Sequence, residues 1–335
     1  MKRINSKDVA YAAGVSQATV SQIYNNSGQI SDATRERVLR VASEMGYDYR
    51  SAKKVRKDSP AFIGVIVPNL FNPVHVASLE MIEQQAALRN MGTVVYNLTI
   101  PDRVPFYNWL MEHDKICAVL FTFTPSDPEI VNRLPERLPV VLLGEKDDTI
   151  HRDTLSLNSC DAGKLLVEHL YSIGHRDIAF LSSMTGDYSR ATERRLTGVR
   201  SAMQQLAIED HLICVFGEDA TPPNNFEAYV HNGMRLAQRT LANSPEDTAI
   251  IGVDDMTCFG AYMYAQTLGM SKRITICSFD DTVLSRICNF TSIDHGFYMR
   301  VCVALDIVQQ RLGKEDSNIP PHKSESQPYL VVRPG

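Results

Sequence analysis

The chain has 335 residues, 44% of them hydrophobic, and a formal net charge of −5 at neutral pH. This length accommodates a small unit and two medium-sized lobes, and the sequence has neither a signal-peptide-like N-terminus nor an apolar run long enough to span a membrane. The seven cysteines form no CxxC pair, so we expect a cytoplasmic protein with reduced thiols and no membrane association.

The N-terminal residues predict two short helices joined by a tight turn. Ser6 and Ser16 each stand where a side-chain oxygen accepts hydrogen bonds from the first turn of a helix. Gly14, between the helices, tolerates the left-handed backbone that such a turn needs. Apolar side chains at helical spacing allow the two helices to pack together. The pattern predicts a helix-turn-helix whose second helix enters a DNA major groove.

A third helix is predicted after Ser31, because apolar residues recur at helical spacing from Val38 to Met45 and Gly46 ends the pattern. Short helix pairs also occur in proteins that never touch DNA. The charge distribution favours DNA, since residues 1–58 carry 11 Lys and Arg against 6 Asp and Glu. The net charge is therefore +5 for this segment and −10 for the remainder. A basic head on an acidic body is typical when only one end meets phosphate.

From residue 61 onward, short apolar runs rich in β-branched residues alternate with helical patterns. Such alternation predicts parallel sheets with helices on both faces, and ligands of such sheets bind at the carboxyl ends of the strands. We therefore expect an α/β protein with a three-helix head and a two-lobed core of doubly wound parallel sheets. The expected strands are Phe62–Val67, Thr93–Leu98, Ala118–Thr122, Val140–Leu143, Asp177–Leu181, Ala249–Val253 and Ile274–Phe279.

No enzyme motif is found in the sequence. It has no GxSxG elbow, no Walker-type loop and no GxGxxG after a strand, and its histidines lack metal-ligand spacing. Asp254-Asp255 and Asp280-Asp281 each follow an apolar run. Neighbouring strand residues point to opposite faces, so each pair delivers one carboxylate to a site unless the backbone turns there. We expect ligand-binding groups, no catalysis, no cofactor and no metal.

Several segments resemble the signature of LacI-type transcriptional regulators. They occur in the order typical of that family and cover nearly the full length, which makes the ordered set far more specific than the helix-turn-helix alone. The segments are Asp8–Ala10, Ala13–Ser16, Ala18–Ser21 and Thr34–Val38 in the head, and Ile63–Pro68, Gly174–Ala179 and Ser278–Asp281 in the body.

The resemblance to the LacI/GalR family implies a domain organisation. It places a DNA-binding head at residues 1–46, a hinge at 47–59 and an effector-binding and dimerisation core at 60–335. The core of this family resembles the periplasmic sugar-binding proteins, with three crossings between the lobes. Lobe 1 is expected at about 60–158 and 292–325, and lobe 2 at about 159–291 and 326–335.

In this family the start of the second helix reads base edges, which assigns that role to Gln17, Ala18 and Gln22. A glutamine amide pairs with adenine, and an alanine methyl packs on a thymine methyl. Many relatives carry arginine where this chain has Gln22, so we expect a changed base preference. The serine and threonine of this helix also suit ordinary surface packing. The expected backbone and phosphate contacts are Ser16, Thr19, Ser21 and Asn25.

The hinge departs from the family pattern, because no proline follows Gly46-Tyr47 and the segment is one residue short. Val55 stands where relatives have a leucine that wedges into the minor groove, and a shorter β-branched valine inserts less deeply. A hinge that works differently is the alternative. Lys53 and Lys54 are expected to contact phosphate, although such a charge run also suits a solvated linker.

The resemblance also implies an effector site between the lobes, where carboxylates and guanidinium groups satisfy hydroxyls and aromatic rings cover apolar faces. Asp280 is the strongest candidate. Arg195 fits the spacing typical of the family best, Arg194 is an alternative, and Arg190 also fits a helix cap. Asp254 replaces the asparagine of many relatives and disfavours an acidic effector. The expected site is Phe71, Asn72, Arg190, Arg194, Arg195, Phe226, Asp254, Asp280 and His295.

These observations predict a sequence-specific DNA-binding transcriptional regulator, and specifically a repressor. We expect it to bind a pseudo-palindromic operator as a homodimer, under the control of a small ligand between the lobes. A sugar is favoured because sugars are frequent effectors in the family. The alternative is a solute-binding or sugar-binding sensor that shares the two-lobed core without binding an operator. The sequence leaves open whether the ligand releases DNA or promotes binding.

Overall fold

The computed structural model describes residues 6–24, 30–45, 61–98, 105–113, 115–183, 190–217, 224–242, 247–270, 274–312 and 319–334. It divides into two units, Met1–Pro60 and Ala61–Gly335, which we call the head and the core. Asn25, Lys53, Lys54 and Val55 lie outside the described residues, as does the predicted hinge at 47–59.

The head contains three helices, α1 (Ser6–Ala12), α2 (Gln17–Tyr24) and α3 (Asp32–Glu44). The turn between α1 and α2 has Gly14 at a φ of 64°, the left-handed conformation that its sequence position predicted. The Ser16 Oγ accepts a hydrogen bond from the Thr19 backbone N–H at 3.0 Å, so Ser16 caps α2. A small core of buried residues joins the three helices: Val9, Ala10, Ala13, Val20, Ile23, Val38 and Ala42.

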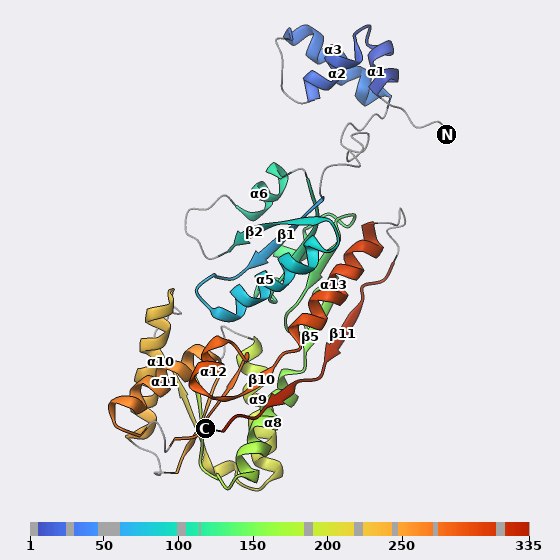
Figure 1. The fold of residues 1–335 in the computed structure, drawn as a ribbon. Coiled ribbons are helices and arrows are strands. Elements are labelled where there is room, and N and C mark those ends of the chain that lie inside the picture. The colour runs from blue at the N-terminus through green and yellow to red at the C-terminus, as the bar shows by residue number, and fades with distance from the viewer. Residues whose placement is uncertain are drawn as a thin grey trace. The chain divides into compact units, whose positions relative to one another are not determined.

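The first lobe of the core is built on a parallel sheet in the order β11-β5-β4-β3-β1-β2. Helices α5 and α13 pack on one face of this sheet (Figure 1), and α6 and α7 pack on the other. The strands are β1 (Ala61–Val67), β2 (Met91–Asn97), β3 (Ile116–Phe121), β4 (Val140–Leu142), β5 (Asp153–Leu157) and β11 (Lys323–Ser326). The helices are α5 (Pro73–Ala87), α6 (Phe106–Glu112), α7 (Glu129–Asn132) and α13 (Phe297–Leu312).

The second lobe repeats this plan with the sheet order β12-β10-β9-β8-β6-β7, parallel except for β12. Helices α8 and α9 cover one face, and α10 and α11 cover the other. The strands are β6 (Ile178–Ser182), β7 (Leu212–Phe216), β8 (Ala249–Gly252), β9 (Ile276–Phe279), β10 (Thr291–Asp294) and β12 (Tyr329–Val331). The helices are α8 (Ser159–Ser172), α9 (Arg190–Gln205), the 3₁₀ turn η2 (Glu209–His211), α10 (Phe226–Leu241), α11 (Asp255–Thr267) and α12 (Val283–Cys288).

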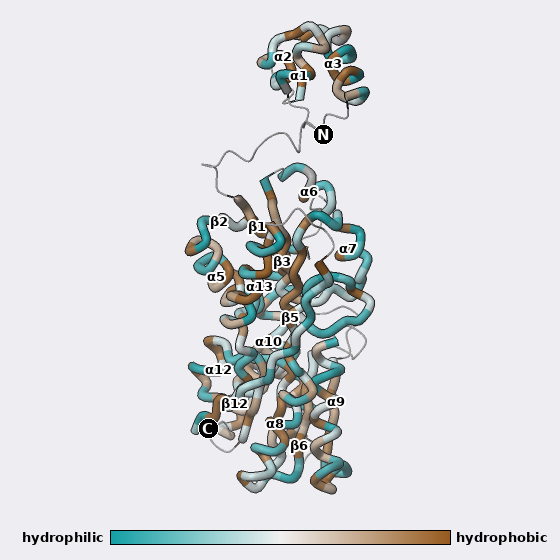
Figure 2. Tube along the Cα trace, turned by 90° about the vertical axis from the view of Figure 1, so that its right-hand side faces the viewer, coloured by the Kyte–Doolittle hydropathy of each residue, from teal (hydrophilic) through white to brown (hydrophobic). Residues whose placement is uncertain are grey.

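Hydrophobic strands form the interior of each lobe, as the brown segments of β1, β3 and β6 show in Figure 2. In the first sheet, Val65 lies opposite Val95 on one neighbouring strand and Leu120 on the other. The predicted α/β fold class, with a helical head and two doubly wound lobes, is confirmed. Among the described residues, no helix is both long enough and apolar enough to cross a membrane.

The chain passes between the lobes three times, and the second passage differs from the expected one. Strand β10 pairs with β9 and β12 of the second sheet, so this part of the second lobe continues to Asp294 and not only to about residue 291. The buried Ser292 donates a hydrogen bond to the Ser278 backbone carbonyl oxygen across these strands. Because such polar residues interrupt the apolar pattern, β10 is a buried strand that the apolar runs did not predict.

Candidate functional site

The outward face of α2 carries the residues predicted to read DNA bases. Gln17, Ala18 and Gln22 are exposed, whereas Val20 and Ile23 on the opposite face are buried in the head core. Ser16 and Thr19 also contact each other, with 2.9 Å between their hydroxyl oxygens, and Ser21 is half-buried. Helix α2 therefore presents one amide, one methyl and a second amide on a surface that the head core supports from behind.

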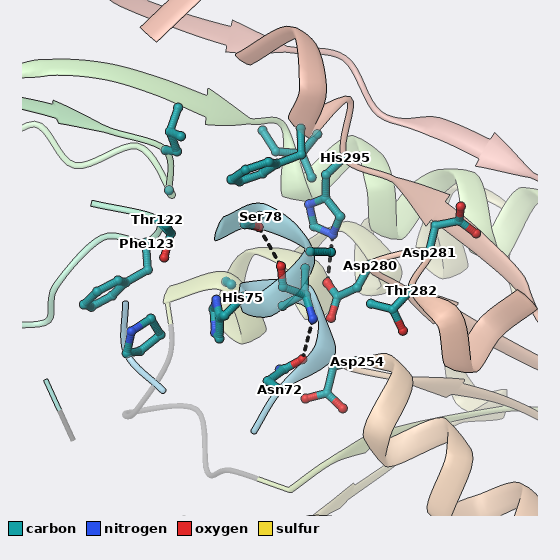
Figure 3. Close-up of a pocket in the computed structure, with 18 of the residues that line it drawn as sticks. Asn72, His75, Ser78, Thr122, Phe123, Asp254, Asp280, Asp281, Thr282 and His295 are labelled. Atoms are coloured by element: carbon teal, nitrogen blue, oxygen red, sulfur yellow. Dashed lines mark hydrogen bonds and ion pairs between the residues drawn. The ribbon is translucent and has the colours of Figure 1, made fainter. Parts of the chain in front are cut away.

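A cleft lies between the two lobes, at the carboxyl ends of strands from both sheets. The close-up in Figure 3 shows side chains from both lobes facing it: Asn72 just before α5, His75 in α5, Thr122 and Phe123 after β3, and Asp254 and Asp280 after β8 and β9. The second sheet therefore contributes Asp254 and Asp280, and the first lobe contributes aromatic and polar groups together with the carboxylates of Glu80 and Glu145.

Asp280 is the centre of a buried charge cluster. Its Oδ1 accepts a hydrogen bond from the Arg195 guanidinium at 3.2 Å and lies 2.8 Å from His295 Nε2. Burial alone would raise the pKa of Asp280, but Arg195 and the hydrogen bond from His295 lower this pKa to about 2. Asp280 has a φ of 100°, so the backbone turns sharply where β9 ends. The site holds an ionised carboxylate at neutral pH.

Arg195 is itself fixed from several sides. Its side chain is buried, it donates to the Val253 backbone carbonyl oxygen, and its guanidinium lies over the Phe279 ring, 4.6 Å from the centroid. The close approach of α9 to α8 depends on Gly198, because a Cβ there would lie 1.9 Å from the Cys160 carbonyl oxygen. Arg195 thus neutralises and orients Asp280.

Asp254 lies at the start of α11 and caps it, since its Oδ1 accepts a hydrogen bond from the Thr257 backbone N–H at 2.7 Å. Burial, together with the nearby charge of Asp280, raises the pKa of Asp254 to about 6. The Tyr229 hydroxyl also donates a hydrogen bond to this carboxylate. The cleft therefore contains two carboxyl groups with well-separated pKa values.

The second carboxylate of each aspartate pair is engaged elsewhere. Asp255 accepts hydrogen bonds from Ser278 and Thr282 within the lobe. Asp281 borders the cleft, but its Oδ1 forms an ion pair with Arg333 at 2.6 Å. In Figure 3, the Asp281 side chain points away from Asp280.

His75 is a cleft residue that the sequence reasoning missed. Burial lowers its pKa to about 4 despite the opposing effect of Asp280, so its ring is neutral at pH 7. Its position three residues after Asn72, in the first turn of a helix that begins at the cleft, was the available signal. Thr122, Phe123 and Tyr229 were missed as well, because they flank the cleft without any local motif.

The remaining predicted residues fall into three groups. Phe71 borders the cleft, 6.3 Å from Tyr229 between ring centroids, and the Asn72 side chain caps α5 by accepting from the Val74 N–H. Phe226, at the start of α10, is not among the residues that line the cleft and packs near Phe259 instead. Arg190 and Arg194 form ion pairs with carboxylates of the first lobe: Asp147, Glu145 and Glu325.

Metal binding has no support in the part of the chain that the structure describes. No group of three or more His, Cys, Asp or Glu side chains there is arranged to hold an ion. Asp280 is instead paired with Arg195 and His295.

Comparison with known proteins places both units of the chain. Residues 6–48 match the model of the bacterial regulatory proteins of the lacI family, and residues 167–334 match the periplasmic binding protein-like domain. The chain belongs to the lacI family of bacterial regulatory proteins. It is accordingly a DNA-binding transcription regulator and not an enzyme, and the alternative of a solute sensor without DNA binding is not supported.

Two relatives of this lacI-family regulator match most of its length. The transcriptional regulator DegA of Bacillus subtilis is 26% identical over 290 residues, covering 84% of this chain and 82% of DegA. The ribose operon repressor of Haemophilus influenzae is 27% identical over 288 residues, covering 84% of this chain and 82% of that repressor.

Solved structures share the fold of this regulator over nearly its full length. A complex of the regulator CelR with cellobiose has a TM-score of 0.64 at 19% identity, with 99% of each chain covered. A lac repressor dimer bound to operator and the anti-inducer ONPF has a TM-score of 0.65 at 22% identity, with 99% of this chain and 98% of that chain covered.

Proposed function

We propose that this regulator is a repressor whose affinity for operator DNA is controlled by an uncharged, polyhydroxylated ligand, a sugar, bound between its lobes. The observation that carries the proposal is the buried cluster of Asp280, Arg195 and His295 at the carboxyl end of β9. A carboxylate that is already ionised and held in place accepts hydrogen bonds from ligand hydroxyls without further reorganisation.

The charge balance of the cleft favours a neutral ligand over an acidic one. The three arginines that the sequence placed in the site each face a carboxylate, Arg190 with Asp147, Arg194 with Glu145 and Glu325, and Arg195 with Asp280. An anionic ligand would have to compete with these internal partners and approach Asp280. The aromatic rings of Phe71 and Tyr229 supply the apolar surface on which a sugar ring packs.

Two relatives point to the same ligand class. One is named for the ribose operon, and a structure of another contains cellobiose. Ribose and cellobiose are both neutral and rich in hydroxyl groups, which agrees with the charge balance of this cleft.

DNA reading is proposed to rest on the exposed face of α2. Gln17 and Gln22, both exposed, are proposed to present their amides to base edges, and Ala18 its methyl group. Ser16, Thr19 and Ser21 are proposed to contact the DNA backbone, together with Asn25 and the hinge residues Lys53, Lys54 and Val55. Repression requires the DNA-containing compartment, so a cytoplasmic location is part of the proposal.

A homodimer is proposed, because a two-fold operator calls for a two-fold protein. Helices α5, α12 and α13 lie on one side of the core in both views (Figures 1 and 2). This side carries apolar side chains exposed by 38% to 76%, more than scattered surface residues explain. A second copy of this chain is the proposed occupant, as in the lac repressor dimer described above. The residues are Val76, Val283, Ile287, Tyr298, Met299 and Val303.

Coupling between the two sites is proposed to act through the angle between the lobes. When a bound ligand alters this angle, the spacing of the two heads of the dimer on DNA is proposed to change as well. The coupling is reciprocal, so operator DNA changes ligand affinity by the same factor.

The proposal is tested by selecting bound sequences from a random DNA pool at near-physiological salt, then titrating neutral and acidic sugars against the selected DNA. We expect an enriched palindrome and a response to a neutral sugar. Uniform weak binding with a steep salt dependence would contradict specific reading. A response only to acidic compounds would contradict the assignment of the cleft.

A further inference from the structure

Two arginines of α9 reach across from the second lobe to carboxylates of the first. Arg190 Nη1 lies 2.7 Å from Asp147 Oδ2, and Arg194 Nη2 lies 2.8 Å from Glu325 Oε1. Arg194 Nε is also 3.4 Å from Glu145 Oε2. The two arginines are four residues apart and therefore share one face of the helix.

Two of the three carboxylates are also held by hydroxyl groups, one of which comes from the second lobe. Glu145 Oε1 accepts a hydrogen bond from the Ser159 hydroxyl at 2.5 Å, and Asp147 Oδ1 accepts from the Thr149 hydroxyl at 2.6 Å. Both acidic residues are buried. Glu145 Oε2 and Asp147 Oδ2 are buried and face their ion-pair partners from the second lobe, Arg194 and Arg190. The charge on these oxygens is therefore balanced chiefly from the other lobe.

These contacts give Arg190 and Arg194 a role other than the expected contact with the effector. Arg194 does not line the cleft, whereas Arg190 does, but the guanidinium of Arg190 is paired with Asp147. In Figure 2, α9 lies on the opposite side of the core from α5 and α12, so the proposed dimer surface leaves these ion pairs uncovered.

We propose that Arg190 and Arg194, with Asp147, Glu145 and Glu325, form an electrostatic latch that stabilises this arrangement of the two lobes. A change in the lobe angle separates the partners and lets water solvate them, so the latch biases the equilibrium between lobe angles. Its contribution falls as salt rises, because Arg190 is partly exposed to solvent. Insofar as the lobe angle transmits the ligand signal, this role rests on the proposed function.

The latch is tested on the full chain by measuring the distance between the lobes with spin labels at Glu112 and Gln204, both exposed and one in each lobe. The labels are attached to a noncanonical amino acid, because the chain contains seven free cysteines. Labelled protein is mixed with excess unlabelled chain, so that a dimer contains one labelled copy. The measurement uses neither DNA nor ligand and therefore stands whether or not the proposed effector is right.

Removing both arginines (Arg190→Ala with Arg194→Ala) is expected to raise the population at altered distances by about two- to fivefold for each pair broken. Wild-type protein at high salt should shift in the same direction. The matched control is Arg133→Ala, which removes an ion pair with Glu129 inside one lobe and should leave the distances unchanged.

An unchanged distance distribution in a folded double variant would overturn the latch. The same change in the Arg133→Ala control would overturn it too, because it would show a general effect of losing an arginine. Should the double variant fail to fold, the salt series on wild-type protein decides, and distances that do not respond to salt would refute the proposal.

Discussion

The head and the cleft use polar side chains in opposite ways. In the head, Gln17 and Gln22 stand exposed on α2, and the buried Val20 and Ile23 stabilise the helix from the other side. In the cleft, the polar groups are themselves buried, and Asp280 is held by Arg195 and His295. Changes on the head surface should therefore alter recognition and leave folding intact, whereas changes in the cleft should alter ligand response and stability together.

The largest effect is expected for Asp280→Asn, which leaves Arg195 and His295 without their charged partner. Losing one member of a buried ion pair should lower the free energy of unfolding by about 3–5 kcal/mol. The ligand response should be lost while operator binding persists, as measured by denaturant titration and DNA titration. Asp306→Asn, in an exposed pair with Arg89, is the control. A normal ligand response in the Asp280 variant would show that the cleft is wrongly assigned.

A somewhat smaller effect is expected for Asp254→Asn, because asparagine also caps helices but carries no charge. The native pKa of Asp254, about 6, lies above its unfolded value of 3.8, so the contribution of Asp254 to stability is greatest at low pH and falls as pH rises through this window. The variant should lack this fall and be more stable at pH 7 by about 2–3 kcal/mol. The denaturation midpoints of the wild-type protein and the variant between pH 4 and 7 measure this difference in stability. The same pH dependence of the midpoint in both proteins would refute the assigned pKa.

On the head, Gln22→Ala is expected to relax base preference at one operator position by about 1–3 kcal/mol. Thermal stability should not change, since Gln22 is exposed. Titration of the protein against operator variants measures the base preference at each position. Gln17→Ala should relax the preference at a different position. An equal loss of affinity on every sequence would mean that Gln22 contacts the DNA backbone instead.

The smallest effect is expected for Ser16→Ala, which removes the cap of α2 and should destabilise this helix by about 1 kcal/mol. Hydrogen exchange of the α2 amides in the full chain reports the change. Ser16→Asn should keep the protection, since asparagine caps equally well. If both variants lose protection alike, the hydrogen bond between Ser16 and Thr19 does not stabilise the helix.

The sequence by itself determined the head, because its caps, turn glycine and apolar spacing act between residues a few positions apart. It also determined the fold class and the place of Asp280, since a carboxylate after an apolar strand lies at the ligand-binding edge of a parallel sheet. The apolar pattern of the sequence did not predict several of the polar strands or edge strands. The exposed β11 and the hydrogen-bonded β10 carry few of the apolar residues that mark a strand.

Only the tertiary structure decided which partner each cleft residue meets. Arg194 and Arg195 are neighbours in the chain, yet one faces Glu145 and Glu325 of the other lobe and the other faces Asp280 of its own. His75 gains its lowered pKa from burial between segments far apart in sequence. The physical reason is that charge pairing and burial depend on distances across the folded chain, which local patterns of residue type do not contain.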